Sequence, residues 1–179
     1  DILEAEEKLR QIIEELSVLM EKQFREQFKV ISENFSQVFQ EMFGGGKAYL
    51  KLTDTENVLE SPIEIVAQPP GKNLQNMQLL SGGERALTAI AILFSILKMK
   101  PSPFCILDEI EAALDDANVT RYARYLKQFA EDTQFIVITH RKGTMEHADV
   151  LYGVTMQEKG ISKLISVDFS EAEKAVETA

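Results

Sequence analysis

Two adjacent carboxylates, Asp108 and Glu109, directly follow a short apolar run at residues 104–107. Such a run predicts a buried strand, and side chains at the carboxyl end of a strand face the crevice in which α/β sheets bind ligands. Asp108 is therefore a candidate Mg²⁺ ligand, and Glu109 is a candidate for orienting or deprotonating an attacking water. The alternative is a strand that simply ends in solvated acids.

A serine and two glycines form a second candidate group: Ser81, Gly82 and Gly83 stand directly before a mostly apolar run at residues 84–97. A serine can cap a helix by accepting from its first free amides, and glycines let the backbone come close to another group. A helix N-terminus with a free hydroxyl and exposed amides can receive a phosphate. The alternative is that Ser81 caps the helix and has no further role.

Two further polar residues lie at the ends of predicted elements. Asp115 can cap an amphipathic helix predicted over residues 115–130. His140 follows a second buried strand predicted at residues 135–138, far enough beyond Glu109 for one strand–helix–strand crossover. Such a crossover would bring both strand ends to the same sheet edge. A lone histidine in this position can also be an ordinary surface residue.

A sheet with flanking helices is needed to position these side chains. The alternation of strand-like and helix-like runs over residues 44–169 predicts an α/β fold with a largely parallel sheet. Besides the two buried strands, further strands are predicted at residues 48–52, 63–66, 150–156 and 163–167.

Residues 1–43 contain neither glycine nor proline, and their apolar side chains recur three or four positions apart. This spacing predicts one long amphipathic helix. The helix is either a core helix or, as its sparse and heavily charged first half favours, a coiled-coil strand that docks through its phenylalanine-rich last turns. The small, charged residues 170–179 predict a flexible tail.

Composition excludes several classes of protein. The chain of 179 residues carries a net charge of −10, so its average field should not attract nucleic acid. The single cysteine, Cys105, excludes an intramolecular disulfide and fits a cytoplasmic protein. The longest apolar run, at residues 86–97, is too short and too often interrupted to span a membrane.

Together these motifs occur in the order and spacing of the ATP-binding-cassette ATPases. Within that superfamily the sequence resembles the C-terminal half of the head of the SMC (structural maintenance of chromosomes) family, and in particular its bacterial condensins. Three segments carry the resemblance: LSGGERAL at residues 80–87, FCILDEIEAALD at residues 104–115, and QFIVITHRKGTM at residues 134–145.

The resemblance implies an ATPase that uses ATP and Mg²⁺. It assigns Asp108 to Mg²⁺ coordination, Glu109 to the role of catalytic base, and His140 to contact with the γ-phosphate. It also assigns four residues to ATP held by an opposing head: Ser81, Gly82, Gly83 and Asp115.

A phosphate-binding loop of the Walker A type is missing. The pattern needs glycine, four residues, Gly-Lys and then serine or threonine, and neither Gly-Lys pair, at residues 46–47 and 71–72, fits it. In the SMC family this loop belongs to an N-terminal lobe. The resemblance therefore implies that lobe as a partner, and it predicts that the chain alone neither holds nor cleaves ATP.

Further partners follow from the resemblance: a second head in an ATP-dependent homodimer, the winged-helix domain of a kleisin subunit, and DNA through the full complex. The implied function is chromosome condensation and segregation at the nucleoid. One alternative is a Rad50-like or RecN-like DNA-repair ATPase, although the stretches QPPG at residues 68–71 and HRKGTM at residues 140–145 favour SMC. The other is a kleisin-binding scaffold without chemistry of its own, which the isolated chain would be.

Overall fold

A computed structural model describes residues 2–131 and 133–168, and the predicted tail at residues 170–179 lies outside them. The chain forms two compact units that divide between Pro103 and Phe104. The elements of the first unit are α1 (Ile2–Phe43), β1 (Lys47–Leu52), β2 (Ile63–Gln68), β3 (Gln75–Asn76), the 3₁₀ helix η1 (Met77–Leu79) and α2 (Gly82–Met99). Those of the second are β4 (Phe104–Asp108), α3 (Asp116–Phe129), β5 (Gln134–Ile138), α4 (Lys142–Met145), β6 (Val150–Glu158) and β7 (Ile161–Asp168).

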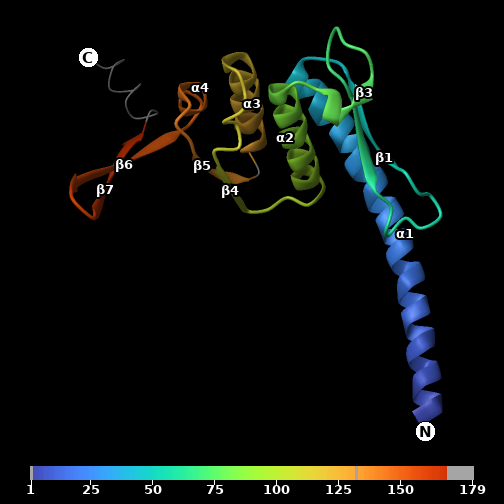
Figure 1. Cartoon of the computed structure of the whole chain (residues 1–179). Coiled ribbons are helices and arrows are strands. Elements are labelled where there is room, and N and C mark those ends of the chain that lie inside the picture. Colours follow the sequence, from blue (N-terminus) through green and yellow to red (C-terminus); the bar gives the residue numbers. More distant parts are fainter. Residues whose placement is uncertain (1, 132, 169–179) are drawn as a thin grey trace. The chain divides into compact units, whose positions relative to one another are not determined.

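Helix α1 runs without a break for 42 residues, as its lack of glycine and proline predicts (Figure 1). Its buried side chains lie in the last turns, and three of them are phenylalanines: Phe35, Val38, Phe39, Met42 and Phe43. Earlier apolar residues such as Leu9 and Ile13 are at least 60% exposed. The first part of the helix is therefore held by its own charge pairs, such as Lys8 with Glu4, and not by a core.

Three consecutive glycines end α1 and turn the chain into β1. Gly44, Gly45 and Gly46 all have positive φ, which only glycine adopts without strain. A Cβ on Gly46 would lie 2.3 Å from the carbonyl oxygen of Gln68, so this position also requires the smallest residue. The tight turn lets β1 return along α1, where the amide of Leu50 donates to the Ser32 hydroxyl at 3.1 Å.

Strands β1, β2 and β3 form an antiparallel sheet in that order. The sheet contacts α1 through β1, and α1 in turn packs against α2, which buries Leu87, Ile90, Ala91 and Phe94. Polar contacts join the two helices: Nδ2 of Asn34 donates to the carbonyl of Ser95, and Nζ of Lys98 donates to the side chain of Gln37.

In the second unit, β4, α3 and β5 form the predicted strand–helix–strand crossover. The strands are parallel, with Phe104 opposite Gln134 and Asp108 opposite Ile138. Aromatic rings of the helix and sheet meet, because the Phe129 ring lies 5.9 Å from that of Phe135. The opposite face of the two strands remains about half exposed in this chain, at Phe104, Ile106, Ile136 and Ile138.

The predicted α/β class with a long N-terminal helix is confirmed. The more specific prediction of a largely parallel sheet flanked by helices needs correction. Among the described residues, parallel pairing is confined to β4 and β5. Parallel neighbours need a crossover of a dozen or more residues, and α3 supplies the crossover between β4 and β5. Strands β6 and β7 are joined by a turn at residues 159–160, so they form an antiparallel hairpin.

Candidate functional site

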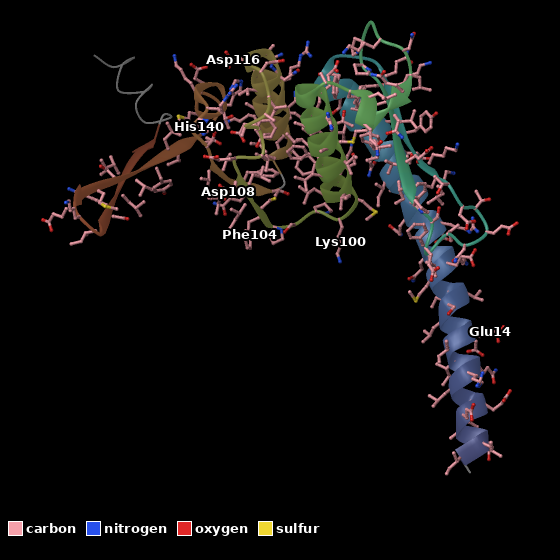
Figure 2. All side chains as sticks on the ribbon, in the orientation of Figure 1. Glu14, Lys100, Phe104, Asp108, Asp116 and His140 are labelled. Atoms are coloured by element: carbon pink, nitrogen blue, oxygen red, sulfur yellow. The ribbon has the colours of Figure 1, made fainter. Side chains whose placement is uncertain are left out.

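The predicted site residues divide between the two units. Ser81, Gly82 and Gly83 belong to the first unit, and Asp108, Glu109, Asp115 and His140 belong to the second. In Figure 2, Asp108 and His140 mark the carboxyl ends of β4 and β5.

Glu109 sits on a backbone turn that begins where β4 ends. Its φ is +47°, a left-handed conformation that residues other than glycine seldom adopt and that costs about 1–3 kcal/mol. Its amide donates to the carbonyl oxygen of Ile138 at 3.0 Å, and its own carbonyl accepts from the amide of Ala112 at 3.0 Å. These bonds hold the turn beside the end of the neighbouring strand.

The side chains of Glu109 and His140 meet, as the crossover predicted. Nδ1 of His140 lies 3.2 Å from Oε1 of Glu109, with 66% of the histidine side chain and 54% of the glutamate side chain exposed. An exposed carboxylate held by an imidazole can accept a proton from water, and it remains open to an arriving ligand.

Asp108 fits the predicted role of Mg²⁺ ligand. Its carboxylate is exposed at the end of β4 and makes no hydrogen bond or ion pair with the described residues. No group of three or more His, Cys, Asp or Glu side chains gathers anywhere in residues 2–131 and 133–168. A single open carboxylate still suits Mg²⁺, because that ion is usually held by one or two carboxylates together with phosphate oxygens and water.

Asp115 caps α3, as predicted. Its Oδ1 accepts from the backbone amide of Asn118 at 2.8 Å, and its Oδ2 accepts from the side-chain amide of the same residue at 3.1 Å. Both carboxylate oxygens are thus engaged in starting the helix.

Arg141 is a site residue that the sequence analysis missed. Its Nη2 donates to the carbonyl oxygen of Leu114 and to Oδ1 of Asp116, each at 2.9 Å. The guanidinium therefore ties the residue after His140 to the segment around Asp115. Only its place directly after His140 could have drawn attention to it, because its acceptors lie more than twenty positions earlier in the chain.

Ser81 lies in a capping box at the start of α2. The Glu84 amide donates to Oγ of Ser81, while Oε2 of Glu84 accepts from the amide and the hydroxyl of Ser81 at 3.0 and 2.7 Å. Nζ of Lys72 lies 2.8 Å from Oε1 of Glu84. The hydrogen bond from Lys72, assisted by those from Ser81, holds the pKa of Glu84 below its ordinary value despite partial burial.

Gly82 has no packing reason to be glycine. A Cβ at this position would meet no atom of residues 2–131 and 133–168 within 4 Å, and the φ of Gly82 is not in the left-handed region. Ser81 and Gly82 are both exposed. An exposed helix start without a side chain leaves room for close approach by something outside the unit.

Comparison with known proteins gives the family. A family model described as the RecF/RecN/SMC N-terminal domain matches residues 5–163. The chain belongs to the RecF/RecN/SMC family. None of the helices that the structure describes in this family member is long and apolar enough to cross a membrane.

Curated relatives of this RecF/RecN/SMC chain include the chromosome partition protein Smc of Bacillus subtilis (strain 168). The two are 63% identical over 177 residues, which is 99% of this chain. The chain spans only 15% of the length of that relative.

Solved structures with a similar fold include an Smc head domain with an extended coiled coil bound to the C-terminal domain of ScpA, derived from Pyrococcus furiosus. The TM-score is 0.83 at 42% identity, over 96% of this chain and 43% of that chain. A chain from work on ATP-driven dimerization and DNA-stimulated activation of SMC ATPases gives a TM-score of 0.77 at 44% identity, over 88% of this chain and 96% of that one. The long helix and the mixed α/β fold are thus features of SMC heads.

Proposed function

We propose that this chain is the C-terminal lobe of an SMC ATPase head. In this proposal residues 1–43 are a coiled-coil strand and neck helix, and residues 44–169 are the lobe. The 3.2 Å contact between Glu109 and His140 carries the proposal, because it joins a proton acceptor to a histidine at the edge of a parallel strand pair.

In the proposed reaction, water attacks the γ-phosphorus of ATP while the bond from that phosphorus to the leaving ADP oxygen breaks. Glu109 orients the water and takes its proton, and His140 holds the Glu109 carboxylate and contacts the γ-phosphate. Asp108 is the residue that would hold Mg²⁺, whose charge offsets that of the phosphates. The exposed carboxylates of Asp108 and Glu109 are compatible with these roles.

In the same proposal, Ser81, Gly82 and Gly83 close on ATP held by a second head, with Asp115 nearby in the interface. The open helix start at Gly82 supports this arrangement, because it leaves space that none of the described residues fills. The head would then be an ATP-dependent homodimer, and the ATP-driven dimerization named for a similar SMC chain agrees with it.

The remaining partners are an N-terminal lobe that carries the Walker A loop, a kleisin with a winged-helix domain, and DNA reached through the full complex. Similar Smc heads bind the C-terminal domain of ScpA, which supports the kleisin. The Smc relative named for chromosome partition supports a role in chromosome condensation and segregation at the nucleoid. The 63% identity to that relative favours this role over a Rad50-like or RecN-like repair ATPase.

Reconstitution with the N-terminal lobe tests the proposed function. We expect no hydrolysis above background from this chain alone, and ATP hydrolysis once the lobe with the Walker A loop is supplied. Activity of the chain alone that Glu109→Gln abolishes would contradict the bipartite site. Kleisin binding by a head that never hydrolyses ATP would instead support the scaffold function.

A further inference from the structure

One buried carboxylate next to the candidate site has no role in the reaction described above. Glu111 has 0% exposure and lies two positions after Glu109. It is the one charged side chain among the buried residues that the structure describes, and the other buried polar side chains carry hydroxyls. Burying a carboxylate is costly unless hydrogen bonds compensate for the lost water.

The contacts of Glu111 reach the segment that carries His140. Oε1 of Glu111 accepts from the hydroxyl of Thr139, which directly precedes His140, and from the hydroxyl of Thr144 in α4 at 3.0 Å. Oε2 has no hydrogen-bond partner within the described residues. The carboxylate is therefore held on one side by two hydroxyls that lie after β5.

The Thr139 hydroxyl also acts as an acceptor. It receives a hydrogen bond from the amide of Arg141 at 3.0 Å while it donates to Glu111. One hydroxyl thus fixes both residues that flank His140 in the sequence. On the other side, the amide of Leu114 donates to the carbonyl of Glu111 at 2.9 Å, which keeps the turn from Glu109 to Leu114 compact.

The charge of Glu111 also acts on its surroundings. Burial, followed by the nearby negative charge of Glu111 and then by Cys105, raises the pKa of Tyr122 far above its ordinary value. Tyr122 lies in α3, the helix that connects β4 to β5. The Glu111 carboxylate is thus close enough to Tyr122 of α3 to act on it electrostatically.

We propose that Glu111 is a positioning residue for hydrolysis, acting through Thr139 to hold His140 against Glu109. This inference rests on the proposed function. The contact between His140 and Glu109 joins two exposed side chains, whose own packing cannot keep them in place. The hydrogen bond from the half-buried Thr139 to the buried Glu111 holds this arrangement, since Thr139 directly precedes His140 and Glu111 lies two positions after Glu109. Misplacing a reacting group by about 1 Å can cost about 10²-fold in rate.

Thr139 and Thr144 provide a matched pair for the test. Each donates to the same oxygen of Glu111, but only Thr139 is adjacent to His140. Replacing either with valine removes one hydroxyl and keeps the side-chain shape. In the full-length protein we expect Thr139→Val to lower kcat by about 10- to 100-fold, with ATP affinity changed less than about twofold. Thr144→Val should lower the melting temperature and leave kcat within about threefold.

Conservative variants that keep the hydrogen bonds should retain activity. Thr139→Ser keeps the hydroxyl and should retain kcat within about threefold of the wild type. Glu111→Gln keeps an oxygen that can accept from both hydroxyls, so it should lose less activity than Glu111→Leu, which has no acceptor. If Thr139→Val fails to fold, Thr139→Ala is compared with Thr139→Ser in its place.

Equal loss of kcat in Thr139→Val and Thr144→Val, or wild-type kcat in Thr139→Val, would overturn the inference. Either result would mean that Glu111 only stabilises the fold. Failure of the proposed function looks different, because the wild type would then show no hydrolysis that depends on Glu109. An active wild type, an inactive Glu109→Gln and an active Thr139→Val would reject the positioning role alone.

Discussion

Nδ1 of His140 lies 3.2 Å from Oε1 of Glu109, although 31 positions separate the two residues in the chain. The parallel register explains this contact, because Asp108 pairs with Ile138 and the residues that follow each strand leave the sheet together. The amide of Glu109 bonds the carbonyl of Ile138 and extends the ladder by one step. The predictions below test what this pair and its neighbours do.

The first prediction concerns Glu109 as the base. In a complete head, Glu109→Gln should reduce ATP hydrolysis by about 10²- to 10⁴-fold, because an amide keeps the shape of the side chain but cannot take a proton. Nucleotide affinity, measured with a fluorescent ATP analogue, should be retained. Loss of that affinity together with hydrolysis would assign Glu109 a structural role.

The second prediction concerns the role of Ser81 in the interface with a second head. A complete head with Ser81→Arg should bind ATP as a monomer but fail to dimerise, since a large cation replaces a small exposed hydroxyl at the closing surface. Light scattering in a Glu109→Gln background measures dimer formation. Ser81→Ala is the control, because it removes the cap, at a cost of about 1 kcal/mol, without adding bulk. Intact dimerisation of Ser81→Arg would leave Ser81 as a helix cap only.

The third prediction concerns the Arg141 guanidinium. Arg141→Lys should lose at least one of its two hydrogen bonds, to the Leu114 carbonyl and to Asp116, because the shorter lysine side chain does not bring its ammonium to the position of Nη2, which makes both bonds. We expect a loss of about 1–2 kcal/mol of stability and a several-fold lower kcat.

Arg121→Lys is the matched control for that variant. It makes the same exchange in α3, where the exposed Arg121 contacts the side chain of Asn118. Thermal unfolding and steady-state hydrolysis of both variants should separate them. Similar kinetics in the two would mean that Arg141 does not help to place the segment around Asp115.

The fourth prediction concerns the pH dependence of the Glu84 contacts. The pKa of Glu84 is lowered in the folded protein, mainly by the hydrogen bond from Lys72. The ionised carboxylate therefore adds stability above the pKa of the unfolded chain, and this contribution disappears as pH falls through the lower folded pKa. Glu84→Gln should be less stable than the wild type at pH 7, and the difference should shrink below about pH 4. A difference that does not vary with pH would rule out a role for the charge.

The fifth prediction uses two neighbouring glycines. Gly44 and Gly46 both have positive φ, but a Cβ at Gly44 meets nothing within 4 Å, whereas one at Gly46 would lie 2.3 Å from the Gln68 oxygen. Gly44→Ala should cost only the backbone strain, about 1–2 kcal/mol. Gly46→Ala should cost clearly more, as chemical denaturation would measure, because β2 must also move. Equal costs would mean that β2 moves without penalty.

Local sequence patterns predicted the structural features that are determined by residues close together in the chain. The absence of glycine and proline predicted the extent of α1. Two apolar runs separated by an amphipathic helix predicted the parallel pair β4 and β5. That crossover also brings Glu109 and His140 to the same edge of the sheet, as predicted. Ser81 and Asp115 were predicted as helix caps because capping is a relation between residues only three positions apart.

Contacts between distant segments were not predictable in the same way. The burial of Glu111 depends on two threonines that follow β5, and nothing in the sequence around Glu111 distinguishes it from a solvated acid. The partners of Arg141 also lie in another segment. The antiparallel pairing of β6 with β7 depends on a short turn, which the expectation of a largely parallel sheet overlooked.

Helix α1 has a mechanical consequence. Its buried side chains lie in the last turns, from Phe35 onward, so residues 2–34 extend from that packed part as a rod. At 1.5 Å per residue this stretch is about 50 Å long, and a tilt of about 10° at its base would move Ile2 by roughly 9 Å, close to one helix diameter. The helix is therefore a lever: a change at its base small enough to preserve the packing of Phe35 and Phe39 would alter which neighbours the exposed residues near Leu9 can reach.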